Sequence, residues 1–232
     1  MTPSRTEILE KVRRSLGVLP EHRKEDSLTE DRITKDRITE DYAAIARDYN
    51  HSGDLGLQSR LDLFAERLGD YGAGLHRCST DDLSPTIAKV CASRQIHRIL
   101  VPSGIPPSWL TATDVEFVSD GNVLTYDAMD KLEGVLTACT AAIALTGTIL
   151  LRHSPNEGRR AITLIPHYHL CVVFESQVVE TVPEAIRQME PFKTLPITTI
   201  SGPSATSDIE MTRIKGVHGP RTLDVILAKG QS

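Results

Sequence analysis

The sequence predicts an α/β fold: an open, mainly parallel sheet flanked by helices, with an antiparallel hairpin in its C-terminal half. Short apolar runs alternate with segments whose apolar residues recur at helical spacing, which is typical of a parallel sheet with crossover helices. Apolar residues make up 40% of the 232 residues, but aromatic residues only 4%. Aliphatic side chains must therefore fill the core, as they do in buried parallel sheets.

The chain is expected to have three parts. Residues 1–19 carry Ile8, Leu9, Val12 and Leu16 at helical spacing and predict a short amphipathic helix. Residues 20–50 are dense in charge, and the segment Asp31-Arg32-Ile33-Thr34 is repeated almost at once as Asp36-Arg37-Ile38-Thr39. This composition favours a flexible linker over a charged helix. Residues 51–232 form the α/β domain.

The first half of this domain shows the alternation directly. Apolar residues from Leu57 to Leu68 predict a helix closed by Gly69, and a strand follows over 74–77. Ser84 and Pro85 are the expected N-cap and first residue of a helix that runs to about residue 93. The apolar runs that begin at Arg98 and at Val115 predict two buried strands.

The small residues of the segment Thr137–Leu145 suit a tightly packed helix, which Thr146-Gly147-Thr148 would end. Two strands, over 149–152 and 161–165, are expected to form the hairpin around a turn at 154–158.

Beyond the hairpin the pattern predicts three more strands, each a short apolar run, and two more helices. The strands cover residues 169–174, 197–200 and 223–227, and the helices begin near Thr181–Pro183 and at Asp208. In open sheets of this kind, ligands bind beyond the carboxyl ends of strands.

Composition excludes several classes of function. A formal net charge of -5 and a pI of about 5.9 argue against a general nucleic-acid binder, which would show a basic face. No apolar run reaches the length of a membrane span, and the N-terminus has no apolar signal region, so a cytoplasmic location is expected.

The four cysteines form no C-x-x-C pair, so we expect buried thiols, with neither a metal site nor an iron–sulfur cluster on this chain. They are Cys78, Cys91, Cys139 and Cys171.

Two glycine-containing segments are candidate anion sites. Thr146-Gly147-Thr148 offers two hydroxyl donors beside a flexible backbone, although a simple turn is the commoner explanation. The segment 201–208 joins a predicted strand to a predicted helix, where backbone N–H groups and the helix dipole favour an anion. Its candidate binding residues are Gly202, Ser204, Thr206 and Asp208; a plain helix cap at Ser207 or Asp208 is the alternative.

Histidine and arginine residues supply the candidate acid–base and carboxylate-binding groups. The turn before the last strand contains His218, Gly219 and Arg221; a histidine can carry a proton near neutral pH, and an arginine can grip a carboxylate with two hydrogen bonds. His169 is a second candidate catalytic residue. His167 lies two residues before it, but no acidic or cysteine partner suggests a metal site.

Three arginines, at positions 152, 159 and 160, surround the predicted hairpin turn. They can attract an anionic substrate, although a solvated charged turn is more common.

Four motifs, in order over residues 96–228, resemble the lactate utilisation protein C family and its LUD domain. They are Ala141-Ala142-Ile143-Ala144-Leu145-Thr146-Gly147-Thr148, Leu164-Ile165-Pro166 followed by His169 and Val172-Val173, Ser201-Gly202-Pro203-Ser204 followed by Thr206 and Asp208-Ile209-Glu210, and Gly216-Val217-His218-Gly219-Pro220-Arg221. Many relatives carry Glu or Asp where this chain has Leu145, so if that acid has a catalytic role in them, this chain lacks it.

The resemblance implies a fold like that of the NagB, ribose-5-phosphate isomerase and CoA-transferase superfamily. It implies a cluster-free subunit of an iron–sulfur complex that oxidises L-lactate to pyruvate, with the clusters on partner subunits. A small carboxylate or phosphate would bind at the Gly202–Asp208 loop. A non-catalytic binding or assembly module of the same superfamily is the alternative.

Overall fold

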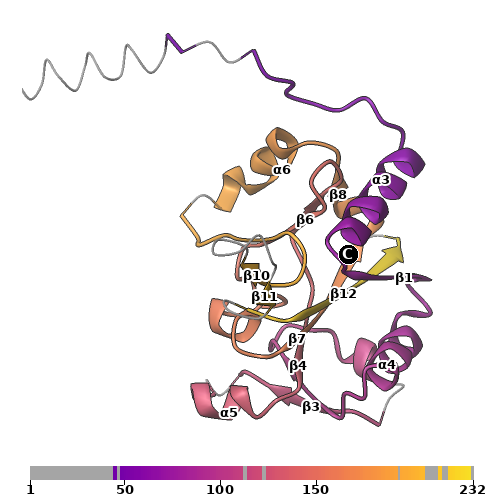
Figure 1. Ribbon diagram of the computed structural model, residues 1–232, viewed down its shortest axis with the longest axis vertical. Coiled ribbons are helices and arrows are strands. Elements are labelled where there is room, and N and C mark those ends of the chain that lie inside the picture. The colour runs from indigo at the N-terminus through magenta and orange to yellow at the C-terminus, as the bar shows by residue number, and fades with distance from the viewer. Residues whose placement is uncertain are drawn as a thin grey trace, which may run out of the picture. The chain divides into compact units, whose positions relative to one another are not determined.

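The computed structural model describes residues 44–45, 48–111, 114–121, 124–192, 194–206, 214–215 and 219–230. The chain divides into two compact units, Met1–Tyr49 and Asn50–Ser232. The predicted N-terminal helix and the duplicated segment lie outside the described residues and stay predictions. Every element described below belongs to the second unit (Figure 1).

A six-stranded sheet forms the centre of this unit, and all its paired strands are parallel. Its strands run in the order β1-β12-β7-β4-β2-β3. This confirms the predicted α/β class. The bounds are β1 (Gly74–Ser79), β12 (Thr222–Lys229), β7 (Tyr168–Phe174), β4 (Gly134–Thr137), β2 (Arg98–Val101) and β3 (Glu116–Ser119).

Both faces of the sheet are covered, which explains why its central strands are continuously apolar. On one face, Ile87 and Val90 of helix α4 (Leu83–Ser93) pack in one cluster with Val172 and Ile226. On the other face, Phe64 of helix α3 (Leu57–Asp70) packs with strand residues of the opposite parity, including Val173 and Val225. The alternation along β7 and β12 therefore places successive side chains in two separate cores.

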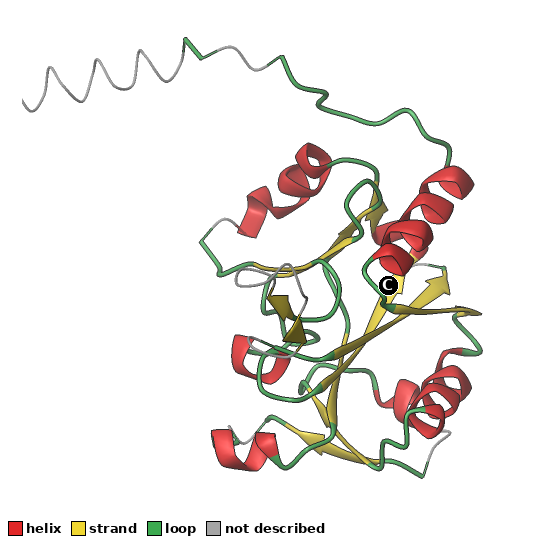
Figure 2. Ribbon diagram, in the orientation of Figure 1, coloured by secondary structure: helices red, strands yellow, loops and turns green. Residues whose placement is uncertain are grey.

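A second, mixed sheet lies beside the first, in the order β8-β5-β6-β9 (Figure 2). Helix α6 (Val182–Met189) covers it. The helix begins at the predicted place, where Thr181 Oγ1 accepts a hydrogen bond from Glu184 N and the Glu184 carboxylate accepts one from Thr181 N. The remaining strands and helices are β5 (Ala141–Ile143), β6 (Thr148–Leu151), β8 (Val178–Val179), β9 (Thr198–Ile200), β10 (Ala205–Thr206), β11 (Ile214–Lys215) and α5 (Tyr126–Asp130). Short 3-10 helices are η1 (Pro107–Leu110), η2 (Arg160–Thr163), η3 (Glu175–Gln177) and η4 (Glu190–Phe192).

The helix predicted over Thr137–Leu145 is wrong. Thr137 ends strand β4, and Ala141–Ile143 forms strand β5. Small residues are needed here because β5 is covered on both sides: Ala141 packs with residues of α6, and Ala142 packs with residues of α3. Tight packing was inferred correctly, but small residues serve a doubly covered strand as well as a helix.

The predicted pairing of 149–152 with 161–165 is also wrong. Strand β6 covers most of the first segment, but η2 and a turn occupy the second. Strand β6 instead pairs with β5, so the antiparallel hairpin lies around Gly147. Ala161, Ile162 and Ile165 all pack in the cluster of Met129, and their spacing in the sequence is helical rather than alternating.

Several helix boundaries differ from the prediction. Helix α3 continues past Gly69 to Asp70, and Gly72, with a φ of 75°, ends the turn instead. Asp82 rather than Ser84 occupies the N-cap position of α4. The predicted helix that starts at Asp208 lies outside the described residues except for Ile214, which is in β11.

A buried carboxylate joins α4 to the central sheet. Asp224 of β12 is fully buried and accepts two hydrogen bonds of 2.7 Å from the Arg94 guanidinium. Tyr168 donates a third, of 3.0 Å. The hydrogen bonds from Arg94 to Asp224 raise the pKa of the guanidinium, and burial raises the pKa of the Tyr168 phenol.

Among the described residues, no helix has both the length and the apolar character that crossing a membrane requires. The four cysteines are free thiols. As expected, Cys91, Cys139 and Cys171 are buried, whereas Cys78 is partly exposed.

Candidate anion-binding site

A cavity of about 300 Å³ opens where the second sheet meets the amino-terminal ends of β7 and β12. Three segments distant in sequence form its walls: the end of β9 with the following loop, the turn before β12, and η2. The lining residues are Arg160, Thr163, Leu164, His169, Thr198, Thr199, Ile200, Ser201, Gly202, Pro203, Ser204, Ala205, Gly219, Pro220 and Leu223. Relative to the central sheet, the cavity therefore lies at the opposite end from the expected carboxyl edge.

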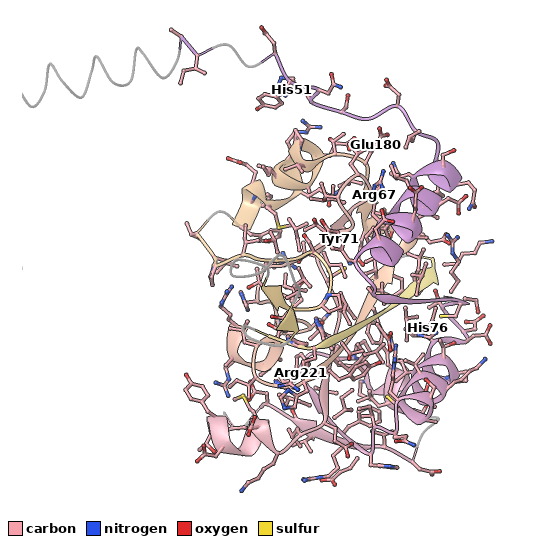
Figure 3. All side chains as sticks on the ribbon, viewed as in Figure 1. His51, Arg67, Tyr71, His76, Glu180 and Arg221 are labelled. Atoms are coloured by element: carbon pink, nitrogen blue, oxygen red, sulfur yellow. The ribbon has the colours of Figure 1, made fainter. Side chains whose placement is uncertain are left out.

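Two of the candidate loops are joined directly. Ser204 N donates a hydrogen bond of 2.8 Å to the carbonyl oxygen of Pro220. Gly202 has a φ of 84°, and a Cβ there would lie 2.5 Å from the Cβ of Tyr71 (Figure 3). A glycine is thus required on both conformational and steric grounds, and the loop is held against the end of α3.

Arg160 supplies the positive charge of the cavity. Its Nη1 donates to Thr198 Oγ1 at 2.9 Å, and the same hydroxyl oxygen lies 2.9 Å from His153 Nε2. Among the described residues that line the cavity, Arg160 is the fixed cation and no aspartate or glutamate is present. With the hydroxyls of Ser201 and Ser204 nearby, the cavity favours an anion that also accepts hydrogen bonds.

His169 forms part of the cavity wall from strand β7 and is only 1% exposed. Its Nε2 lies 2.8 Å from Thr137 Oγ1 on the neighbouring strand. Burial lowers the pKa of the imidazole to about 4. The ring is therefore neutral at physiological pH. It can orient a ligand through a hydrogen bond, but it contributes no positive charge to the cavity.

The Thr146-Gly147-Thr148 turn connects to the cavity through hydroxyl groups. Thr148 Oγ1 lies 2.7 Å from Thr146 Oγ1 and 2.8 Å from Ser201 Oγ, and Ser201 lines the cavity. Gly147 has a φ of 58°, and a Cβ there would lie 2.8 Å from Arg67 Cβ (Figure 3). The turn thus supports the cavity loop from behind without lining it.

The structure brings together four of the predicted site residues in one cavity: His169, Gly202, Ser204 and Gly219. Arg221 does not line it; the residue is exposed, its backbone N donates to the His167 carbonyl, and Figure 3 shows it well apart from Tyr71. Thr206 is in β10, and nothing is described of its side chain. Asp208 and His218 lie outside the described residues.

The predicted helix after this loop, from Asp208, lies outside the described residues except for Ile214, so a helix terminus at the loop stays a prediction. Ser204 is followed by the short strand β10, which pairs with β11. Among the described residues, Arg160 and the hydroxyl groups account for the anion preference of the cavity. Leu145 lies near the turn of the β5–β6 hairpin, is 47% exposed, and does not line the cavity.

Sequence reasoning missed Thr163 and Thr198 as cavity residues. It named Arg160 only as one of three arginines that can attract an anionic substrate, with a solvated charged turn as the commoner explanation. The signal was weak because Thr198 is the first residue of a short strand, where a threonine is ordinary. The two adjacent arginines, Arg159 and Arg160, were a clue. Arg159 pairs with Asp120, and Arg160 faces the cavity.

Within the described residues, no three His, Cys, Asp or Glu side chains lie close enough together to hold a metal ion. His167 is exposed and His169 is buried, so the two histidines do not face a common site.

Comparison with known proteins agrees with the motifs of the site. The LUD domain matches residues 61–228. "Lactate utilization protein C" of Deinococcus radiodurans is 44% identical over 169 residues, which cover 72% of this chain and 78% of that protein. A protein of the same name from Shouchella clausii is 38% identical over 118 residues, covering 45% of this chain and 51% of its own.

A solved structure shares the fold. The crystal structure of a DUF162 family protein from Deinococcus radiodurans has a TM-score of 0.66 and 39% identity, and the match covers 75% of this chain and 99% of that one. The family match extends over most of the α/β unit and includes every residue that lines the cavity. The chain belongs to the LUD domain family.

Proposed function

We propose that this chain is a lactate utilisation protein: the cluster-free subunit of an iron–sulfur complex that oxidises L-lactate to pyruvate. The observation that carries this proposal is the 44% identity over 72% of the chain to a protein named "Lactate utilization protein C". The cavity between Ser201–Ser204, Gly219 and Arg160 is the proposed carboxylate site.

The cavity has the groups that a small hydroxy acid needs. Arg160 can pair with the carboxylate through charged hydrogen bonds, while Ser201 and Ser204 offer hydroxyls to the remaining oxygens. His169, neutral at physiological pH, can hydrogen-bond to the substrate hydroxyl through Nδ1, because Nε2 is the nitrogen that lies beside Thr137 Oγ1. These residues bind and orient the substrate.

Oxidation of lactate to pyruvate removes two electrons and two protons from the hydroxyl-bearing carbon and its oxygen. In this proposal the electrons pass to iron–sulfur clusters of partner subunits, and the protons are released to solvent. The role of this chain is to hold the carboxylate or to organise the partners that carry out the electron transfer.

A gene deletion tests the lactate role. Loss of the gene should abolish growth on L-lactate but not on glucose, and Arg160→Gln should restore growth far less well than the wild-type gene. Arg98→Gln is the matched control because Arg98 forms an exposed pair with Glu116 away from the cavity. Normal growth of the deletion strain on L-lactate would contradict the proposal.

Purification tests the complex. Tagged protein from lactate-grown cells should bring down iron-containing subunits and reduce a dye in the presence of L-lactate. A chain recovered alone, without iron or activity, would contradict membership of a redox complex.

One observation favours a second candidate, a non-catalytic binding or assembly module. The cavity has no carboxylate among its described lining residues, and its histidine is neutral at physiological pH, so it lacks an evident acid–base pair. An Arg160→Gln variant that still assembles with the iron-containing subunits and supports full lactate-dependent activity would favour this alternative.

A further inference from the structure

A second cavity, of about 360 Å³, lies on the opposite edge of the central sheet. It opens beyond the carboxyl ends of β4 and β7, where Ala138 and Phe174 line it, and Trp109 of η1 closes it from the β2 side. The chain leaves β2 toward β3 on one side and leaves β4 toward β7 on the other. The cavity therefore lies at the topological switch point, where open α/β sheets bind ligands.

An arginine without a hydrogen-bonding partner lines this cavity. Arg152 Nε is buried and has no hydrogen-bond partner, and no hydrogen bond or ion pair of its guanidinium occurs among the described residues. The two other arginines of this region are engaged: Arg159 pairs with Asp120 at 2.8 Å, and Arg160 donates to Thr198. A buried donor left unsatisfied is costly, so the Arg152 site is stabilised if an acceptor enters.

The guanidinium is already positioned. Its central carbon lies 3.8 Å from the centroid of the Phe192 ring, so the ring faces the cation and the N–H edge stays available. Stacking of this kind leaves an arginine free to grip a carboxylate with two hydrogen bonds while its orientation is held by the aromatic face.

The other walls favour an apolar group on the ligand. Trp109 and Phe174 pack with ring centroids 6.0 Å apart, and both line the cavity with Phe192 and Ala138. Aromatic walls around one or two polar groups are typical of small-molecule sites. A cavity of this volume holds a carboxylate that carries one aromatic ring or a branched aliphatic chain.

A buried carboxylate on the cavity wall limits the charge of the ligand. Glu157 is 2% exposed and lines the cavity, and its oxygens accept hydrogen bonds from Thr140 Oγ1, Arg152 N and Ser154 N. Because the negative charge of Glu157 partly offsets that of the Arg152 guanidinium, a dianion such as phosphate is disfavoured. A monoanion satisfies the arginine with less repulsion.

We propose that the cavity bounded by Arg152, Trp109, Phe174 and Phe192 is a second ligand site, specific for a small monocarboxylate with an apolar or aromatic group. This second site is separate from the carboxylate cavity at Arg160. The proposal for it does not depend on the proposed role in lactate oxidation.

Trp109 makes a direct test available because it is the single tryptophan of the chain. Titration of the full chain with phenylacetate should change its fluorescence in a saturable way. The neutral analogue phenylacetamide and inorganic phosphate should bind at least tenfold more weakly. Arg152→Gln should weaken phenylacetate binding at least tenfold, and Phe192→Leu should weaken it several-fold.

Arg98→Gln is the matched control, since Arg98 pairs with Glu116 and lines neither cavity, and its phenylacetate affinity should equal that of the wild type. Circular dichroism confirms that each variant is folded, and a misfolded Arg152→Gln would leave Phe192→Leu and the phenylacetamide comparison to decide. The proposal is overturned if phenylacetate gives no saturable change, if phenylacetamide binds equally well, or if folded Arg152→Gln keeps the wild-type affinity.

Discussion

Replacing His169 with glutamine should change how stability depends on pH. Burial lowers the pKa of His169 to about 4 in the folded protein, against an ordinary value of about 6.5 in the unfolded chain. Between these values the unfolded chain binds a proton that the folded protein does not. The stabilisation is fully present above about pH 6.5 and is lost as the pH falls toward about 4, by about 3 kcal/mol in total.

Urea unfolding at about pH 8 and about pH 5 measures this effect. Integration over the interval predicts that the wild type loses about 2 kcal/mol more unfolding free energy than His169→Gln between the two pH values. His167→Gln, an exposed neighbour two residues away, should follow the wild type. Equal pH dependence of wild type and His169→Gln would refute the argument that the imidazole is buried and neutral.

Three further substitutions test how the fold holds the site. Arg94→Met leaves the buried Asp224 carboxylate without its cation and should lower the unfolding free energy by about 3 kcal/mol in urea titration; a loss below about 1 kcal/mol would show that water replaces the guanidinium. Gly202→Ala forces a side chain into a left-handed conformation against Tyr71 and should cost about 1–3 kcal/mol, measured as a lower Tm; an unchanged Tm would mean that the loop rearranges freely. Thr181→Ala removes the N-cap of α6 and should cost about 1 kcal/mol by the same measurement, whereas no loss would leave the capping box without a stabilising role.

Much of the fold can be predicted where local and tertiary preferences agree. The runs beginning at Arg98 and at His169 are strands as expected, since a doubly covered parallel sheet needs continuous apolar residues. Thr181 begins a helix because the threonine, proline and glutamate each satisfy a specific requirement of a helix N-terminus. The residues that determine each of these elements lie within a few positions of one another in the sequence.

The errors arise where tertiary packing decides. Residues 141–143 form a strand because α6 covers one face and the core around α3 covers the other, which small residues alone do not reveal. Residues 161–165 are apolar in either conformation, and only their contacts with Met129 and Leu100 place them in a 3-10 helix and turn. Met129 and Leu100 are both distant from residues 161–165 in the sequence, so no local pattern indicates these contacts.

The candidate site shows the same division. The motif residues Gly202, Ser204, Gly219 and His169 were expected to act together, and they share one cavity. The cation was assigned to Arg221, but the structure places Arg160 in the cavity instead. Both arginines lie beside turns and have no distinguishing pattern, so only the contact of Arg160 in η2 with Thr198 at the start of β9 separates them.

Binding of L-lactate to the purified full chain tests directly whether the cavity at Arg160 is the carboxylate site. We expect saturable heat in isothermal titration calorimetry and an affinity at least tenfold weaker in Arg160→Gln, because a charged hydrogen bond contributes about 1.5–3 kcal/mol. Arg98→Gln should bind as the wild type does. If L-lactate gives no saturable heat, or if Arg160→Gln binds it with unchanged affinity, the cavity at Arg160 is not the carboxylate site.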